Sequence, residues 1–291
     1  TMIAVETKSL SKRYENGVDG VIDLDLSVET SEIFGFLGPN GAGKTTTIRL
    51  LNGTLNPTGG TADVLGITSQ TELVRAKTST LGELANMYES MTVYENLMFF
   101  AAMYDIRPQA AADRIKELLE KMQLWDKRDL KFGSFSTGMK KRVQLVRVLL
   151  HRPELIFLDE PTAGLDPDSS AQVTDLIYEL AKESGTTIFL CTHKLPLAER
   201  ICDSFGFISN GTMVISGKKE QIIQSVIQET KVTILTTEGE YIYPYHEETD
   251  INKRIRELLD QGKTILEVRR ARPSLEDAYF HYIGRDEHGM V

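Results

Sequence analysis

A glycine-rich stretch near the amino end has the residue types needed to hold a chain of phosphates. The apolar run Ile33–Leu37 leads into Gly38-Pro-Asn-Gly-Ala-Gly-Lys-Thr45, and a helical pattern over Thr46–Leu51 follows. The glycines let the backbone curl so that successive N–H groups point at phosphate oxygens. Lys44 adds a positive charge, and the Thr45 hydroxyl can coordinate Mg²⁺. The stretch therefore predicts a site for the phosphates of a nucleotide and for Mg²⁺.

This spacing is that of the Walker A motif, in which a strand enters a glycine loop and a helix leaves it. The amino end of that helix adds the positive end of its dipole. We expect the whole loop to contact the nucleotide. The residues concerned are Gly38, Pro39, Asn40, Gly41, Ala42, Gly43, Lys44, Thr45 and Thr46. Kinases, GTPases, helicases and transporters all carry such a loop, so it does not identify the activity alone.

Two acids end a second apolar run. Leu155–Leu158 precedes Asp159 and Glu160, a pattern typical of a buried parallel strand whose carboxyl end lies at a ligand crevice. We expect Asp159 to hold Mg²⁺, directly or through water. Glu160 is expected to polarise the water that attacks the γ-phosphate, a general-base role worth about 10²–10⁴ in rate. The alternative is an acidic pair that caps the turn before Pro161.

The remaining motifs resemble those of the ABC ATPase family. Phe135-Ser-Thr-Gly-Met139 precedes a helical pattern and is similar to the family's signature sequence. Thr137 stands where the family usually has its first signature glycine, and Met139 where many members have glutamine. Ala163–Asp166 resembles the D-loop, which contacts a second nucleotide domain. His193 follows another apolar strand, as the family's switch histidine does. Each motif alone also fits a structural role, and their order along the chain favours the family.

The resemblance implies roles for single residues. Glu160, His193 and Lys44 would be catalytic, and Thr45, Asp159 and Glu83 would hold the metal. Tyr14 matches the aromatic residue that stacks on adenine, a contact worth about 1–3 kcal/mol. An ordinary tyrosine at a strand end is the alternative. Ser136 and Gly138 would contact the nucleotide bound by a second copy of the chain.

Glu83 departs from the family pattern. In the family, a glutamine at this point reaches Mg²⁺ and the attacking water. Aligning Met91–Leu97 with the family's similar stretch places Glu83 there, and no glutamine lies from Thr71 to Pro108. A carboxylate can also ligate Mg²⁺, although it adds negative charge. We hypothesise that Glu83 binds the metal and makes nucleotide occupancy more Mg²⁺-dependent. An unchanged Mg²⁺ dependence of ATPase activity in Glu83→Gln would contradict this.

The pattern of elements predicts an α/β fold. It combines a P-loop NTPase core, an antiparallel β lobe, a helical subdomain and a small α+β C-terminal appendage. Alternating runs over 3–66, with a hairpin signal at Asn16-Gly17, predict the lobe. Helices are expected over 93–125, strands over 231–236, 241–245 and 264–268, and a helix over 250–261. We expect an ABC-type ATPase domain over 1–220, with its helical subdomain at about 84–150, and an accessory domain over 221–291.

The composition of the chain limits the classes of ligand and surroundings that it fits. The formal net charge of −9 argues against binding of nucleic acid, which needs a basic face. The only two cysteines, Cys191 and Cys202, fit a reducing compartment and match no zinc-ligand spacing. No apolar run approaches the roughly 20 residues of a spanning helix, so the chain is not expected to cross a membrane.

The resemblance implies an ATP-hydrolysing subunit that powers a membrane transporter through ATP-driven dimerisation. Its expected partners are integral membrane permease subunits and a second nucleotide-binding subunit, in a homodimer. The expected location is cytoplasmic, on the inner face of the cell membrane. The stretch Arg272–Tyr279 resembles the end of drug-resistance and sodium-efflux exporter subunits, which favours an exporter. An importer subunit, a soluble ABC-type ATPase and a P-loop kinase or switch are the alternatives.

Overall fold

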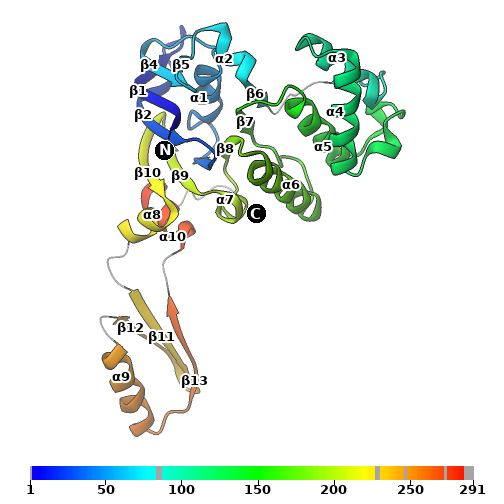
Figure 1. Cartoon of the computed structure of the whole chain (residues 1–291). Helices are drawn as coiled ribbons and strands as arrows, with labels where there is room; N and C mark the ends of the chain where they lie inside the picture. The colour runs from blue at the N-terminus through cyan, green and yellow to red at the C-terminus, as the bar shows by residue number, and fades with distance from the viewer. Residues whose placement is uncertain (1, 83–86, 227–229, 246–247, 272–273, 285–291) are drawn as a thin grey trace. The chain divides into compact units, whose positions relative to one another are not determined.

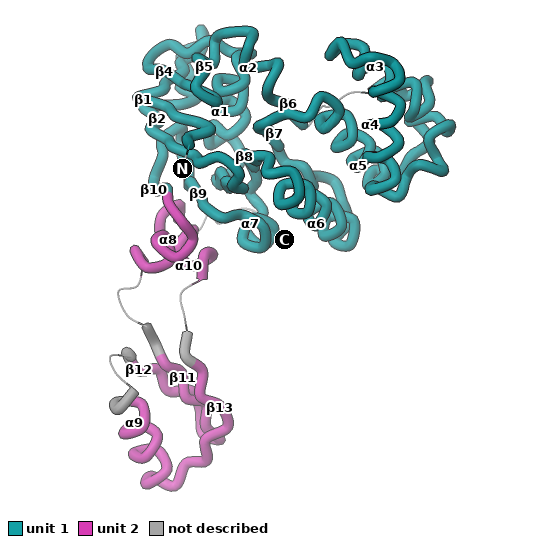
Figure 2. Tube along the Cα trace, viewed as in Figure 1, with its two compact units in different colours: residues 1–216 teal, residues 217–291 magenta. Residues whose placement is uncertain are grey.

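The computed structural model describes residues 2–82, 87–226, 230–245, 248–271 and 274–284 (Figure 1). The chain divides into two compact units, residues 1–216 and residues 217–291 (Figure 2). The first unit contains an antiparallel sheet, a mostly parallel sheet and a group of helices. The predicted α/β fold class is therefore confirmed.

The antiparallel lobe is built from the first part of the chain. Its sheet has the order β2-β1-β4-β5. The strands are β1 (Ile3–Arg13), β2 (Asp19–Glu29), β4 (Gly59–Val64) and β5 (Ile67–Thr68). The Tyr14 N–H donates to the Val18 carbonyl over 2.8 Å, and Gly17 has a φ of 82°, which closes the predicted hairpin.

The second sheet positions the motifs that the sequence predicts to be catalytic. Its order is β10-β9-β3-β8-β7-β6, and the pairs β6/β7, β7/β8, β8/β3 and β3/β9 are parallel. The strands are β3 (Ile33–Leu37), β6 (Thr78–Leu81), β7 (Leu155–Asp159), β8 (Thr187–Thr192), β9 (Ser204–Ser209) and β10 (Thr212–Lys218). Because β3, β8 and β7 are adjacent and parallel, the residues that follow their carboxyl ends meet at one edge.

An aromatic cluster holds these three strands in register. Phe34, Phe36 and Phe157 all lie close to Phe189, with ring centroids 5.3, 5.4 and 5.8 Å away. Each ring is at most 2% exposed. Full burial of one such side chain stabilises the fold by about 1.5–3 kcal/mol. The cluster therefore anchors the strands from which the phosphate loop and the acidic pair extend.

Helices flank this sheet and form the rest of the first unit. Those that follow its strands are α1 (Lys44–Leu51), α6 (Pro167–Ser184) and α7 (Leu195–Ile201), whereas α2 (Glu72–Lys77) precedes β6. The helical part contains α3 (Val93–Met103), α4 (Pro108–Lys121), two 3₁₀ turns (Trp125–Lys127 and Phe132–Ser134) and α5 (Thr137–Leu149). A capping box between Thr92 and Glu95 begins α3, and Pro108 begins α4. The helices predicted over 93–125 are present.

The second unit is a small α+β structure. Its sheet has the order β12-β11-β13. The elements are α8 (Lys219–Ser225), β11 (Thr230–Thr236), β12 (Gly239–Tyr245), α9 (Glu248–Asp260), β13 (Ile265–Ala271) and α10 (Leu275–Ile283). Val232, Ile234 and Leu258 form its own apolar cluster, with Ile251 and Ile255 from α9 packed against it. The predicted strands and helix of the appendage are present.

Membrane-spanning segments were sought among the described residues. No helix in these ranges combines the length and the apolar character needed to cross a bilayer.

Candidate active site

The glycine loop joins β3 to α1. Gly43 stands at the N-cap of α1 with a φ of 110°, and no side chain caps the helix there. A Cβ on Gly43 would lie 2.4 Å from the Gly20 carbonyl oxygen, so no other residue fits without moving β2. The uncapped amino end and the inward curl of the loop form a site suited to phosphate oxygens.

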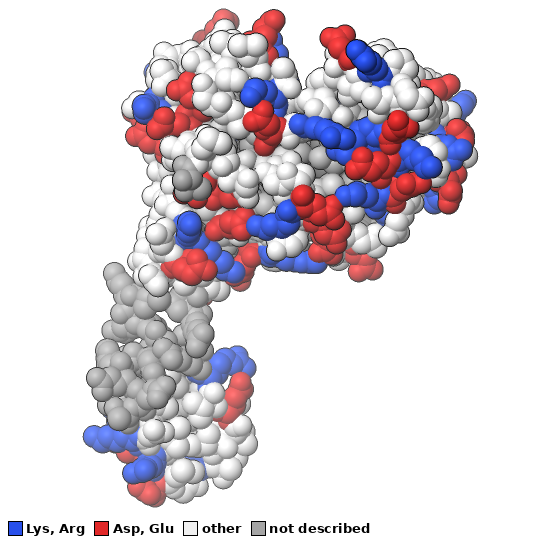
Figure 3. All heavy atoms as spheres, in the orientation of Figure 1, with Lys and Arg blue, Asp and Glu red and all other residues white. Residues whose placement is uncertain are grey.

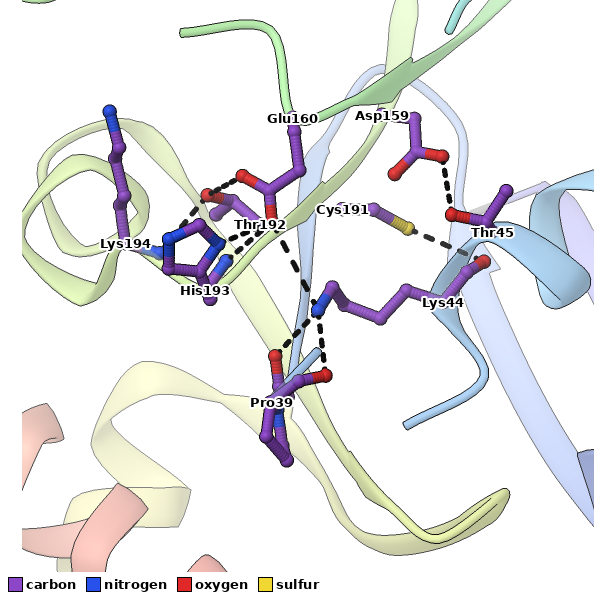
Figure 4. A network of polar contacts seen from close by, with 10 residues as sticks. Pro39, Lys44, Thr45, Asp159, Glu160, Cys191, Thr192, His193 and Lys194 are labelled. Carbon is purple, nitrogen blue, oxygen red and sulfur yellow. Dashed lines mark hydrogen bonds and ion pairs between the residues drawn. The ribbon is translucent and has the colours of Figure 1, made fainter. Parts of the chain in front are cut away.

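Lys44 lies within this loop and is 6% exposed. Its Nζ donates to the carbonyl oxygens of Gly38 and Pro39, over 2.6 and 3.0 Å, and lies 4.0 Å from Glu160 Oε1 (Figure 4). Burial lowers the pKa of Lys44, and the nearby charge of Glu160 only partly opposes this. The ammonium is therefore poorly hydrated, and a phosphate oxygen would be a better partner than neutral carbonyls.

Thr45 and Asp159 come together from α1 and β7. The Thr45 hydroxyl donates to Asp159 Oδ2 over 2.7 Å (Figure 4). Asp159 is 6% exposed, whereas Thr45 is exposed. Hydroxyl and carboxylate oxygens are the hard ligands that Mg²⁺ prefers, and the ion keeps its remaining sites for water and phosphate. These two residues therefore fit a magnesium ion.

Glu160 follows β7 in a left-handed backbone conformation, with a φ of 47°. Its N–H donates to the Cys191 carbonyl over 2.9 Å, which ties this turn to the end of β8. Its side chain faces the residues that follow Cys191, as Figure 4 shows. A non-glycine residue with positive φ is held by its surroundings, and such positions cluster at functional sites.

His193 contacts Glu160 through two of its nitrogen atoms. Its backbone N–H donates to Glu160 Oε1 over 3.0 Å, and its ring Nδ1 lies 2.7 Å from the same oxygen. Because an ionised carboxylate only accepts, the proton of a neutral ring lies on Nδ1. The ring is 45% exposed and leaves Nε2 available to a ligand. The structure therefore brings the predicted Lys44, Thr45, Asp159, Glu160 and His193 together.

Tyr14 lies beside the start of α1. Its hydroxyl and that of Thr46 are 3.0 Å apart. The ring packs against Gly20, where a Cβ would be 2.7 Å from Tyr14 Cε2. Lys12 Nζ lies 5.8 Å from the ring centroid. The half-buried ring thus borders the phosphate loop.

Ser136 and Gly138 lie at the beginning of α5. Ser136 Oγ accepts the Met139 N–H over 3.3 Å and caps this helix. Gly138 is close to Ser169, whose Oγ would be 3.2 Å from an added Cβ. Within the described part of the chain, no hydrogen bond or ion pair joins Ser136 or Gly138 to the phosphate loop. Glu83 lies outside the described residues.

Three site residues had no predicted role. The Cys191 thiol faces the Lys44 carbonyl oxygen at 3.9 Å, and the Thr192 hydroxyl donates to Glu160 Oε2 over 3.0 Å. Lys194 Nζ donates to the carbonyl oxygen of Thr162, in the turn after Glu160, over 3.0 Å. A hydroxyl directly before the histidine was the only signal in the sequence. Its contact depends on the pairing of β7 with β8, which the sequence does not specify.

Comparison with known proteins relates this chain to one family by sequence and by fold. The family model for the ABC transporter matches residues 21–163. The daunorubicin/doxorubicin resistance ATP-binding protein DrrA of Streptomyces peucetius is 39% identical over 225 residues, 77% of this chain and 68% of that protein. The bacitracin transport ATP-binding protein BcrA of Bacillus licheniformis is 32% identical over 302 residues, 96% of this chain and 97% of that protein. A solved ATP-binding subunit of an ABC transporter is 30% identical, with a TM-score of 0.68 over 76% of this chain and 92% of its own. The chain therefore belongs to the ABC transporter family, as one of its ATP-binding and ATP-hydrolysing subunits.

Proposed function

We propose that this chain powers an exporter by closing a dimer around ATP and opening it after hydrolysis. The observation that carries this is the site itself: a phosphate loop, a metal pair and a base meet in one chain, while no hydrogen bond among the described residues joins Ser136 or Gly138 to them. This supports a site that a second copy of the chain completes with its own Ser136 and Gly138.

Each site residue has a defined chemical role in this proposal. Lys44 and the loop N–H groups bind the phosphates, Tyr14 stacks on adenine, and Thr45 and Asp159 hold Mg²⁺. When bound, Mg²⁺ neutralises charge on the phosphate oxygens. Glu160 accepts the proton of the attacking water, and His193 holds Glu160 and contacts the γ-phosphate. Glu83 as a further metal ligand stays a prediction.

The two copies would meet head to tail. ATP on the loop of one copy would also contact Ser136 and Gly138 of the other, so that ATP closes the dimer and loss of the γ-phosphate loosens it. In one chain, Ser136 caps α5 with its hydroxyl exposed at the helix start. An exposed helix start suits a phosphate supplied from outside the subunit.

Membrane permease subunits are the proposed partners, at the inner face of the membrane. A cleft of about 430 Å³ beside α3 and α5 supports this proposal. It is lined by Phe100, Met103, Tyr104 and Arg147 among others. Met103 is 67% exposed and Tyr104 40%, an apolar surface suited to a partner helix. The 221–291 region is proposed as an accessory domain.

Export is favoured by the relatives. Their names give resistance to daunorubicin and doxorubicin, bacitracin transport and Nod factor export. A soluble ATPase that acts on DNA or the ribosome is the second reading. On the face of the first unit in Figure 3, basic and acidic side chains are interspersed. Together with the net charge of −9, this disfavours binding of a polyanion.

Glu160→Gln tests the proposal directly. We expect the variant to bind ATP, to lose turnover by about 10²–10⁴-fold and to accumulate as a dimer. Phosphate release and size-exclusion light scattering with Mg-ATP measure these effects. Glu154→Gln is the matched control, because Glu154 directly precedes β7, whereas Glu160 directly follows it, and Glu154 is exposed. A monomeric Glu160→Gln variant that hydrolyses ATP normally would refute the mechanism.

A mixing experiment tests the composite site. Lys44→Met disables the phosphate loop of one copy, and Ser136→Arg disables the signature of the other. In a mixed dimer, one of the two sites has an intact loop and an intact signature. We expect ATPase activity to reappear when the two inactive variants are mixed. If each site belonged to a single chain, the mixture would stay as inactive as its components.

A further inference from the structure

The hydroxyl of Thr192 lies against the proposed general base. Thr192 ends β8, and the pairing of Asp159 with Cys191 puts Glu160 and Thr192 at adjacent ends of neighbouring strands. Thr192 is 0% exposed, and its Oγ1 is 3.0 Å from Glu160 Oε2 (Figure 4). The hydroxyl of Thr192 is therefore shielded from bulk solvent.

The neighbours of Thr192 determine where its proton points. The Lys194 backbone N–H donates to Thr192 Oγ1 over 3.1 Å. This N–H cannot accept, and the ionised carboxylate cannot donate. The proton of the Thr192 hydroxyl is therefore directed at Glu160 Oε2. A side chain that could only accept would leave that oxygen without its donor.

The other oxygen of Glu160 is already occupied. Oε1 faces the His193 N–H at 3.0 Å, the His193 Nδ1 at 2.7 Å and Lys44 Nζ at 4.0 Å. An ionised carboxylate has about four lone-pair directions. Among the described residues, Thr192 is the one hydrogen-bond donor to Oε2. The direction that remains open is therefore on Oε2, and it is available for a proton from water.

We propose that Thr192 is a positioning residue that orients Glu160 so that the open side of Oε2 faces the attacking water. The inference rests on the proposed role of Glu160 as the base. The Glu160 side chain has several rotatable bonds, and His193 holds only one of its oxygens. Thr192 fixes the second oxygen and so prevents rotation of the carboxylate. A misoriented base lowers the rate of the chemical step and leaves nucleotide binding unchanged.

The same hydroxyl also caps the turn before α7, through the Lys194 N–H. A change of residue 192 could therefore act on the fold as well as on Glu160. Thr192→Val has nearly the same shape without the hydroxyl, Thr192→Ala lacks it without adding bulk, and Thr192→Ser keeps it. Comparison of the three separates the hydroxyl from packing.

The test measures kcat, KM, ATP affinity and Tm for these variants of the full chain. We expect kcat of Thr192→Val and Thr192→Ala to fall about 10–100-fold, as for loss of a bond to a charged group. The KM and the ATP affinity of these two variants should stay within about twofold of the wild-type values. The kcat of Thr192→Ser should stay within about threefold of wild type, because this variant keeps the hydroxyl. Equal losses in Thr192→Ser and Thr192→Val would overturn the inference, because the hydroxyl would then not be the cause.

A double variant that combines Thr192→Val with Glu160→Gln tests whether Thr192 acts through Glu160. If Thr192 acts through Glu160, then adding Thr192→Val to Glu160→Gln causes no further loss of turnover. A further loss of about tenfold or more would show an independent structural effect and overturn the inference. The two proposals fail separately. Normal turnover in Glu160→Gln refutes the base itself, whereas an inactive Glu160→Gln with a fast Thr192→Val refutes only the role of Thr192.

Discussion

Lys44 combines a buried charge with weak partners. Its ammonium is bound by carbonyl oxygens and lies 4.0 Å from Glu160, yet burial still lowers its pKa below the ordinary 10.5. The folded chain thus binds this proton less tightly than the unfolded chain does. The charged side chain therefore lowers the free energy of unfolding at every pH below the pKa of Lys44 in the folded chain. This destabilisation decreases as the pH rises from that pKa to the higher pKa of Lys44 in the unfolded chain.

Lys44→Met should therefore weaken ATP binding without lowering the thermal stability of the nucleotide-free chain. At neutral pH without nucleotide, we expect the Tm to stay the same or to rise, because a poorly hydrated charge is removed. ATP affinity should fall about 10–100-fold, since a bond from a charged group to phosphate contributes about 1.5–3 kcal/mol. Thermal denaturation and ATP titration measure the two effects. A nucleotide-free variant that melts well below wild type would contradict the pKa argument.

The two thiols give a second prediction. Cys191 is 0% exposed and Cys202 9%, and burial raises the pKa of both thiols. Because the thiolate is the reactive form, we expect a thiol reagent at pH 8 to react at least about 100-fold more slowly with the native chain than with the unfolded chain. The exposed replacement Ser27→Cys should react at once. Rapid reaction of the native wild-type chain would contradict the protection of the two thiols by burial.

Single residues differ in how well the sequence predicts them. The loop from Gly38 to Thr45 was predictable because its residue types follow from local backbone geometry and phosphate chemistry. The contacts of Thr192 and Lys194 were not, because they arise where β8 pairs with β7. The metal role of Glu83 stays a prediction.

At the scale of elements, the phosphate loop depends on two glycines with positive φ. Gly41 has a φ of 81° and nothing near its Cβ position, whereas Gly43 has a φ of 110° and faces the Gly20 carbonyl. Gly41→Ala should destabilise the fold only because alanine disfavours a positive φ, by roughly 1–2 kcal/mol, and this lowers the Tm by about 2–8 °C. Gly43→Ala should lower it further, because β2 must move. Thermal denaturation without nucleotide tests this, and equal shifts would contradict the proposed contact with β2.

Element boundaries follow local rules where caps and prolines occur. Pro108 begins α4 and Pro167 begins α6, and the hairpin at Asn16-Gly17 is present as predicted. The helix predicted from Thr46 starts at Lys44, because the uncapped loop passes directly into α1. The left-handed turn at Glu160 had no signal in the sequence, since tertiary contacts with β8 hold it.

At the scale of the whole molecule, composition and strand patterns predicted the fold class but could not fix the division of the chain. We expected the accessory domain to begin at 221, inside α8, whereas the two compact units divide after Ser216, inside β10. No glycine- or proline-rich linker marks this point in the sequence. A separate role for the 221–291 region stays a prediction.

Each unit has its own apolar cluster, so we expect two unfolding transitions by calorimetry. Mg-ATP should raise only the transition of the first unit, because a ligand stabilises the part that binds it. Ile234, which is 0% exposed, lies in the cluster of the second unit, and Ile234→Ala should destabilise that unit by about 2–5 kcal/mol. Ile242→Ala is the matched control, because Ile242 lies on the neighbouring strand and is 59% exposed. Ile234→Ala should leave ATP turnover and the Mg-ATP shift intact. A single transition that responds to both Mg-ATP and Ile234→Ala would mean that the two clusters unfold as one.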